Sequence, residues 1–500
     1  MSLPVSIRTS RISTLLLAAA LVAVPACNKK KGKGTGAPQP TQEEIAKKVG
    51  DAKKTAKAAS LVDLANKDLA SGRYVSASKR AHEALEADPK DADAYSVLGA
   101  ALWRAGDYQG STDAYRKGVE LNPKNFGAVL GLARNLQAAG QHKAAADMQD
   151  VLIAEDKEQV DPRLTKFWSY YSLLDADQAV AQLDEIFKRL PADDPSLPLV
   201  QAFAAFVRPL VGKGPFLVVE GATGSSDANL ATSAGLKFSG ATIGGEFGQV
   251  VFNEGREECL IDTATAEALK LAPVGKLKPI DSQNEENIVI IPEIKFGDLK
   301  LKNVPAIVRS LESFAMIGEK PAVILGRQAM NAIGSMTFDF PKRSLTLTKD
   351  APASAPDGAA ELPFVLLTVH AFHWPAVPIK INGSEHEFFV YFGGLYPSGL
   401  SVAKKPYLKS GNLPRAVENP EDVENGIKMR LVEKLTLGDK VLPTIGSHVL
   451  VNTPPDPGLG NVLSSTGFEL GGYLNAALMS NWKVTYAFSK GRVYIDPDGG

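Results

Sequence analysis

The chain contains little cysteine, because only Cys27 and Cys259 occur among its 500 residues. If Cys27 is modified near the amino terminus, Cys259 has no partner within the chain. A fold stapled by disulfides is therefore excluded. Cys259 opens the apolar run Cys259-Leu260-Ile261, and we expect it to be a small core residue rather than a nucleophile.

The chain also lacks an excess of charge of either sign. It has 55 lysines and arginines against 56 aspartates and glutamates, which gives a formal net charge of −1. This balance provides no bulk electrostatic attraction to nucleic acid, so we expect no nucleic-acid partner. Hydrophobic residues make up 44% of the chain and charged residues 22%, a globular composition, and 500 residues predict two to four domains.

The amino-terminal apolar run, Ile12 to Val24, is too short for a comfortable transmembrane helix. It follows the basic residues Arg8 and Arg11 and ends in Val24-Pro25-Ala26-Cys27. This arrangement resembles the signal peptide of a bacterial lipoprotein. A plain secretory signal with a chance cysteine is the alternative.

The lipoprotein resemblance implies that residues 1–27 are a signal peptide and that Cys27 is lipidated as the first mature residue. Asn28 rather than aspartate follows the cysteine, which favours the outer membrane of the cell envelope, facing the periplasm. Residues 28–42 are rich in lysine, glycine and proline and are predicted to form a flexible tether. The membrane is thus an expected partner through the lipid anchor.

Residues 43–210 show helical periodicity with a repeat of 34 residues. Glycine, leucine and small residues keep this interval in three successive units, at Gly72, Gly106 and Gly140, at Leu64, Leu98 and Leu132, and at Ala77, Ser111 and Ala145. Glycine suits the sharp turn between two helices, and small residues let the helices approach closely. The pattern resembles the tetratricopeptide repeat, which implies an all-α solenoid with a concave surface for a protein or peptide partner.

Beyond Lys213 the composition shifts to short alternating runs rich in valine, isoleucine, glycine and threonine, which predict β structure. The linker 350–361 divides this region into residues 213–349 and 362–500. Both halves end in a short helix, a strand, a turn and a final strand. The β region resembles a bilobal retropepsin-like aspartic protease, so mainly-β barrels are the expected fold.

The first lobe supplies the signals that carry this resemblance. Asp262-Thr263 follows an apolar strand, although Ala264 stands where the family has glycine. Ile324-Leu325-Gly326 then resembles the second apolar strand of such a lobe. The resemblance implies that Asp262 is the candidate catalytic carboxylate and that Thr263 supports it.

The second lobe has the same opening but no aspartate. Val377 to Gly383 reads as a strand entering an Asn-Gly hairpin turn, and Phe388-Phe389-Val390 as the returning strand. Tyr391-Phe392-Gly393 then stands where the family has Asp-Thr-Gly, so we interpret it as a degenerate second site opposite Asp262. Leu470-Gly471 is interpreted as the counterpart of Leu325-Gly326.

Aspartic proteolysis needs two carboxylates that share one proton. With Asp262 alone, the favoured function is a non-catalytic protein that binds an extended peptide in the cleft between the lobes, through strand pairing, and a protein partner on the repeats. The alternative is an active aspartic endopeptidase that uses Asp262, for example through dimerisation. His370 and His373 alone do not make a metal site, so no metal or cofactor is expected.

Overall fold

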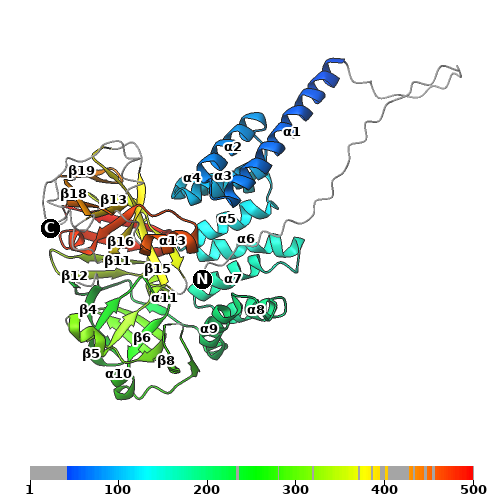
Figure 1. Ribbon diagram of the computed structural model, residues 1–500. Coiled ribbons are helices and arrows are strands. Elements are labelled where there is room, and N and C mark those ends of the chain that lie inside the picture. The colour runs from blue at the N-terminus through cyan, green and yellow to red at the C-terminus, as the bar shows by residue number, and fades with distance from the viewer. Residues whose placement is uncertain are drawn as a thin grey trace, which may run out of the picture.

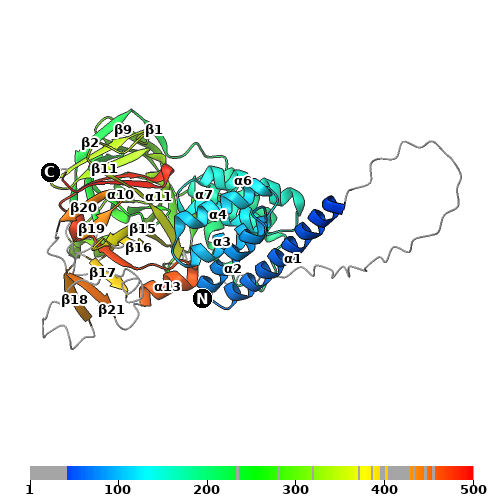
Figure 2. The same cartoon turned by 90° about the horizontal axis from the view of Figure 1, so that it is seen from above.

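The computed structural model describes residues 42–231, 236–279, 281–317, 320–369, 372–383, 387–394, 400–403, 427–431, 434–443, 448–452 and 457–498. The predicted signal peptide with Cys27, and residues 28–41 of the predicted tether, lie outside these ranges. A helical region comes first along the chain, and a β-rich region follows it. Figure 1 shows the helices stacked along one side of the β region, and Figure 2 shows the same division from above.

The helical region consists of antiparallel helix pairs that follow the predicted 34-residue period. The turns within the first three pairs contain Gly72, Gly106 and Gly140, with φ of 71°, 78° and 74°. Leu174 occupies the same place in the fourth pair with φ of 54°, so the turn geometry persists without glycine. The helices are α1 (Gln42–Ala70), α2 (Tyr74–Ala87), α3 (Ala92–Arg104), α4 (Tyr108–Leu121), α5 (Phe126–Ala138), α6 (His142–Glu155), α7 (Asp161–Ser172), α8 (Ala176–Phe187), α9 (Leu197–Val207) and the 3-10 turn η1 (Arg208–Leu210).

Small residues allow these pairs to stack. The Tyr115 ring of α4 is inserted between Gly99 of α3 and Gly131 of α5. A Cβ atom at Gly99 or Gly131 would lie 2.7 or 2.2 Å from that ring, so a larger residue does not fit at either position. The Asp91 and Asn125 side chains accept hydrogen bonds from the first turns of α3 and α5 and fix where these helices begin.

The first β unit is a sheet of nine described strands in the order β1-β9-β6-β10-β5-β4-β8-β7, with β3 paired to β4. In it β10 lies between β5 and β6, parallel to β5 and antiparallel to β6. Its elements are β1 (Val218–Glu220), β3 (Asn229–Ala231), β4 (Leu236–Ile243), β5 (Glu246–Phe252), β6 (Cys259–Asp262), α10 (Thr263–Ala268), β7 (Gly275–Leu277), β8 (Glu286–Phe296), β9 (Leu299–Arg309), η2 (Glu312–Ile317), β10 (Val323–Leu325) and α11 (Arg327–Ala332).

The second β unit repeats this arrangement. Among its nine described strands, β22 lies between β16 and β17, parallel to β16 and antiparallel to β17. Its elements are β14 (Val365–Val369), β15 (Phe372–Ile381), β16 (Phe388–Gly394), β17 (Leu400–Ala403), β18 (Ile427–Leu431), β19 (Lys434–Leu437), β20 (Lys440–Pro443), β21 (His448–Asn452), α13 (Pro457–Thr466), β22 (Gly472–Asn475) and α14 (Ala476–Met479). Strands β5, β6 and β10 therefore correspond to β16, β17 and β22.

A third sheet of six described strands joins the two units, in the order β13-β24-β23-β11-β12-β2. At its centre β11 pairs with β23, and the hydroxyl oxygens of Thr337 and Thr485 lie 2.8 Å apart. Each unit contributes its terminal hairpin, and these two hairpins were predicted from the sequence, whereas their pairing in one sheet was not. The strands are β2 (Thr223–Asp227), β11 (Ser335–Asp339), β12 (Ser344–Thr348), β13 (Ala360–Pro363), β23 (Lys483–Ala487) and β24 (Arg492–Asp496), with η4 (Phe488–Lys490) between the last two.

The helical stack packs directly against the β region. Helices α7 to α9 share one apolar core with both β units. Trp103 donates a hydrogen bond from Nε1 to the Thr466 carbonyl at 2.8 Å, and its ring packs 4.8 Å from that of Phe468. A Cβ at the turn residues Gly106 and Gly140 would lie 2.5 and 2.3 Å from the carbonyl oxygens of Glu469 and Phe488. The turns thus sit directly on the backbone of the second unit.

The strand register corrects two interpretations of the sequence. Val323 of β10 lies opposite Ile261, and its counterpart in the second unit, Gly472 of β22, lies opposite Val402. Val402 therefore corresponds to Ile261, and the next residue, Ala403, corresponds to Asp262. Tyr391 and Phe392 are instead residues of β16, and Phe392 corresponds to Phe252 of β5. The interpretation that Asp262 and the Tyr391-Phe392 segment occupy equivalent turns is therefore wrong.

The second correction concerns the predicted pair of apolar motifs. Ile324, Leu325 and Gly326 do form the end of β10 and the start of α11. Their counterpart is Leu474-Asn475, because Leu474 pairs with Phe392 as Leu325 pairs with Phe252. Leu470-Gly471 precedes β22, and the Gly471 N–H donates to the Phe389 carbonyl at 2.7 Å.

Candidate functional site

Asp262 is a buried anchoring carboxylate at the end of β6, with only 2% of its surface exposed. One carboxylate oxygen accepts from the Leu311 N–H at 3.0 Å. The other accepts from the Ala264 N–H at 3.1 Å and lies 3.0 Å from Lys320 Nζ. Burial raises the pKa of Asp262, but these donors outweigh burial and the net pKa is lowered. Among the described residues, the charged group paired with Asp262 is a lysine and not a second carboxylate.

The surroundings of Asp262 belong to the first β unit alone. It lines a cavity of about 540 Å³ whose other lining residues come from β4, β5, α10 and the segment before β10. Thr263, the first residue of α10, is exposed, and its side chain forms no hydrogen bond with a described residue. Asp262 and Thr263 therefore do not face Tyr391 or Phe392 across the two units.

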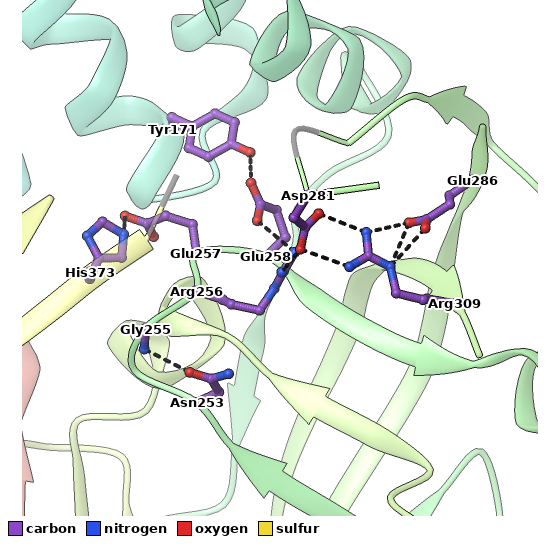
Figure 3. A network of polar contacts seen from close by, with 10 residues as sticks. All are labelled: Tyr171, Asn253, Gly255, Arg256, Glu257, Glu258, Asp281, Glu286, Arg309 and His373. Atoms are coloured by element: carbon purple, nitrogen blue, oxygen red, sulfur yellow. Dashed lines mark hydrogen bonds and ion pairs between the residues drawn. The ribbon is translucent and has the colours of Figure 1, made fainter. Parts of the chain in front are cut away.

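The loop that does lie between the units is Asn253–Glu258, which joins β5 to β6 (Figure 3). Asn253 Oδ1 accepts from the Gly255 N–H at 2.9 Å, which closes a tight turn directly after β5. The Gly255 carbonyl accepts from the His373 N–H of β15 at 3.0 Å. The same turn thus connects the first unit to the second.

Glu254 is paired with a buried lysine. Lys237 Nζ lies 2.6 Å from Glu254 Oε1, and the Lys237 side chain is 2% exposed. Lys237 Nζ also lies 5.4 Å from the centre of the Tyr486 ring, which comes from the second unit. Burial, with the Glu254 charge as a smaller cause, raises the pKa of Tyr391. The Glu254 carboxylate is therefore neutralised by an amine and lies near two phenols of the second unit.

Glu257 contacts all three parts of the molecule. Its Oε1 accepts from the Ser172 hydroxyl of α7 at 2.7 Å, and lies 3.0 Å from His373 Nε2 and 3.4 Å from Arg327 Nη2. Burial raises the pKa of Glu257, but Arg327 and His373 outweigh it and the net pKa is lowered. Arg327 also donates to His142 Nε2 at 2.7 Å. Burial and the Arg327 charge lower the pKa of His142 to about 3, so its ring is neutral.

Glu258 extends this network in the other direction (Figure 3). The Tyr171 hydroxyl of α7 donates to Glu258, and Arg256 lies 3.8 Å from the same carboxylate. Arg256 pairs with Asp281, which Arg309 also contacts at 2.9 Å. Two arginines thus hold the pKa of Asp281 low despite its burial. These groups are already paired with one another, so the network fastens the helices to the β units.

Sequence reasoning missed this junction and found Asp262 instead. The signal that could have found it is the run Asn-Glu-Gly-Arg-Glu-Glu between two apolar strands, which is too charged for an ordinary tight turn. Of the two histidines considered as ligands, His373 is buried in the junction and His370 lies outside the described residues. Across the described part of the chain, no three His, Cys, Asp or Glu side chains form a group that could hold a metal.

No family model matches the chain. It is 47% identical over 62 residues to small glutamine-rich tetratricopeptide repeat-containing protein 2 of Mycosarcoma maydis, which is 12% of this chain and 18% of that protein. It is 30% identical over 92 residues to superkiller complex protein 3 of Homo sapiens, 18% of this chain and 6% of that protein. The helical region is a tetratricopeptide repeat module. The chain spans less than a fifth of the length of these curated relatives.

Solved structures resemble the chain over about a third of its length. A MamA protein from Desulfovibrio magneticus is 18% identical, with a TM-score of 0.27, and covers 30% of this chain and 83% of its own. A thermophilic tetratricopeptide protein of Thermus thermophilus is 18% identical, with a TM-score of 0.26, and covers 31% and 84%. Among the described helices, none is long and apolar enough to cross a membrane.

Proposed function

We propose that the chain is a lipid-anchored envelope protein that combines a tetratricopeptide interaction module with a retropepsin-like, non-catalytic β region. The proposed anchor is Cys27, and the proposed location is the outer membrane, facing the periplasm. Replacement of this residue in the Cys27→Ser variant is expected to abolish labelling by a fatty-acid probe and to release the protein from the membrane fraction. Unchanged labelling and fractionation would contradict the anchor.

The duplicated strand arrangement supports the retropepsin-like assignment. Each unit places a short strand between two others, parallel to one and antiparallel to the other, and follows it with a short helix. A six-stranded sheet built from both terminal hairpins joins the units. A bilobal protease has this kind of internal repetition, with one catalytic carboxylate in each half.

The observation that carries the non-catalytic proposal is the chemistry at the equivalent loops. After β5 the chain has Asn253 and then Glu254, whose carboxylate is paired with Lys237. At the equivalent positions after Phe392, the chain has Gly393 and Gly394, neither of which carries a side-chain carboxylate. Two carboxylates that share a proton are required to activate water and polarise a peptide carbonyl. At these two equivalent positions the described chain has one carboxylate, that of Glu254, and Lys237 is already paired with it.

The exposed arginines of the helical module indicate the chemistry of its partner. Arg104 of α3 and Arg134 of α5 form no ion pair with a described residue. Burial raises the pKa of Tyr115 to about 12, and both arginines act to lower it, which places their charges around the same phenol. Two exposed arginines on adjacent repeats suit an acidic protein segment.

A peptidase assay tests the proposal. The purified full chain is expected to leave a peptide library uncut from acid to neutral pH, and the Glu254→Gln and Asp262→Asn variants are expected to behave identically. The alternative, an aspartic endopeptidase that uses Asp262, requires cleavage that a statine-type inhibitor blocks and that Asp262→Asn abolishes. Dependence of such cleavage on protein concentration would support a dimeric enzyme.

A further inference from the structure

The cavity beside Asp262 has the size and lining of a binding site. Its volume of about 540 Å³ falls in the range of small-ligand and peptide side-chain pockets. Ile243, Ala268, Leu269 and Ala322 provide an apolar wall. Phe247 stands at its rim and is 76% exposed, the largest exposed fraction among the large hydrophobic residues of the described chain.

The strand edge of β5 along this cavity has backbone groups without a described partner at Phe247. The hairpin of β4 and β5 pairs Ile243 with Glu246 and then Thr242 with Phe247. In an antiparallel pair, alternate residues direct their N–H and C=O groups away from the partner strand. Gln249 does so, because its carbonyl accepts from the Ala322 N–H at 2.8 Å. By the same alternation the Phe247 N–H and C=O point to that side, but β10 begins only at Val323 and no described residue pairs with them.

The charges of the cavity favour a cation. Lys320 is the cation that lines it, and it is already paired with Asp262 at 3.0 Å and with Glu312. Glu246 also lines the cavity, is exposed, and forms no ion pair with a described residue. The charge left for a ligand to neutralise is therefore negative.

We propose that the Phe247 edge and this cavity bind an extended peptide segment that carries an aliphatic side chain next to a lysine or arginine. The peptide backbone pairs with the Phe247 N–H and C=O and adds a short strand beside β5. The aliphatic side chain enters the cavity, and the cationic group pairs with Glu246. This site uses neither the junction loop nor the repeat surface, so it does not depend on the function proposed above.

Fluorescence anisotropy with the purified full chain tests this site. The probe is a labelled peptide of alternating valine and threonine with one lysine, and saturable binding is expected. A matched peptide with glutamate in place of lysine should bind at least about threefold more weakly. N-methylation of the probe backbone, which removes the pairing donors, should weaken binding about tenfold.

Two variants locate the site on the chain. Phe247→Pro removes the unpaired N–H, whereas Phe247→Ala keeps it, so the proline variant should lose more affinity than the alanine variant. Circular dichroism checks that both variants remain folded. If the proline variant does not fold, the N-methylated probe still tests the backbone pairing on the wild-type chain. Absence of saturable binding, or equal binding of the N-methylated probe, would overturn the proposal. Self-association of the chain that Phe247→Pro abolishes would also overturn it, because the occupant would then be a second copy.

Discussion

The two β units share one framework but differ at the loop that follows their equivalent strands β5 and β16. In the first unit this loop is the charged segment Asn253–Glu258, whose three glutamates are buried and whose contacts reach the helices and the second unit. In the second unit β16 ends in Gly393-Gly394. The strand pairing is the same in both units, because Leu325 pairs with Phe252 as Leu474 pairs with Phe392. The residues that follow Phe252 and Phe392 differ. Repetition of a fold therefore preserves its packing more strictly than its chemistry.

The largest expected effect comes from removing the buried guanidinium of Arg327 from the first unit. Arg327→Ala leaves Glu257 without its arginine in a site where the side chains are 2% and 8% exposed. Breaking one side of such a pair costs about 3–5 kcal/mol of unfolding free energy. Urea unfolding of the full chain measures this loss.

The control for Arg327→Ala is the Arg116→Ala variant. Arg116 forms an exposed pair with Asp113 at 3.0 Å, so its loss should cost less than about 1 kcal/mol. Similar destabilisation by both variants would show that the junction contributes no more than a surface ion pair.

A smaller effect is expected at Gly326, where the two units differ directly because its counterpart is Asn475. Gly326 has φ of −84°, so its backbone does not require glycine. A Cβ there would lie 2.3 and 2.4 Å from the carbonyl oxygens of Glu258 and Glu257. Gly326→Ala should therefore cost about 1–3 kcal/mol through overpacking against the junction loop.

Thermal unfolding of Gly326→Ala is compared with that of Gly460→Ala. Gly460 lies in α13, and a Cβ there would meet no atom within 4 Å. Alanine in a helix is favoured over glycine, so this control should be neutral or slightly stabilising. If Gly326→Ala leaves the melting temperature unchanged, the backbone of the Asn253–Glu258 loop shifts at little cost in free energy.

The smallest effect is expected at Asp262, whose counterpart is Ala403. Asp262→Asn removes a charge that caps α10 and pairs with Lys320, and should cost about 1 kcal/mol near neutral pH. The folded-state pKa of Asp262 is lowered from 3.8, so the stabilisation is present above this unfolded value and is lost as pH falls through the folded pKa.

The free energy of unfolding of both proteins, measured from neutral to strongly acidic pH, checks this. The curves of the wild type and Asp262→Asn should differ at neutral pH and converge in acid. A constant difference at every pH would assign the effect to the shape of the side chain rather than to its charge.

Local patterns predicted much of the fold. The 34-residue period gave the helix pairs and their glycine turns, because Gly72, Gly106 and Gly140 report a backbone conformation that few other residues adopt. The Asn-Gly turn of the second unit was also predicted, and Asn382 and Gly383 have φ of 50° and 71°. These features depend on residues close in sequence.

The junction could not be predicted because its partners are distant in sequence. Glu258 accepts a hydrogen bond from Tyr171, which is 87 residues away in the sequence. Glu257 accepts one from Ser172, which is 85 residues away. The unusual charge of the loop marks the segment as exceptional, but it does not identify these partners. Asp262 was chosen because an apolar strand that ends in Asp-Thr resembles a returning hairpin strand. The true returning strand, β5, ends ten residues earlier, at Phe252.

The seating of the repeat turns on the second β unit sets a limit on the shape of the helical stack. A solenoid of repeats usually adapts its curvature through small rotations between neighbouring units. Here the turns at Gly106 and Gly140 are held against the backbone at Glu469 and Phe488. A partner that needs a tighter or wider curve must first separate these surfaces. The β region therefore acts as a template that favours partners matching one curvature of the repeats.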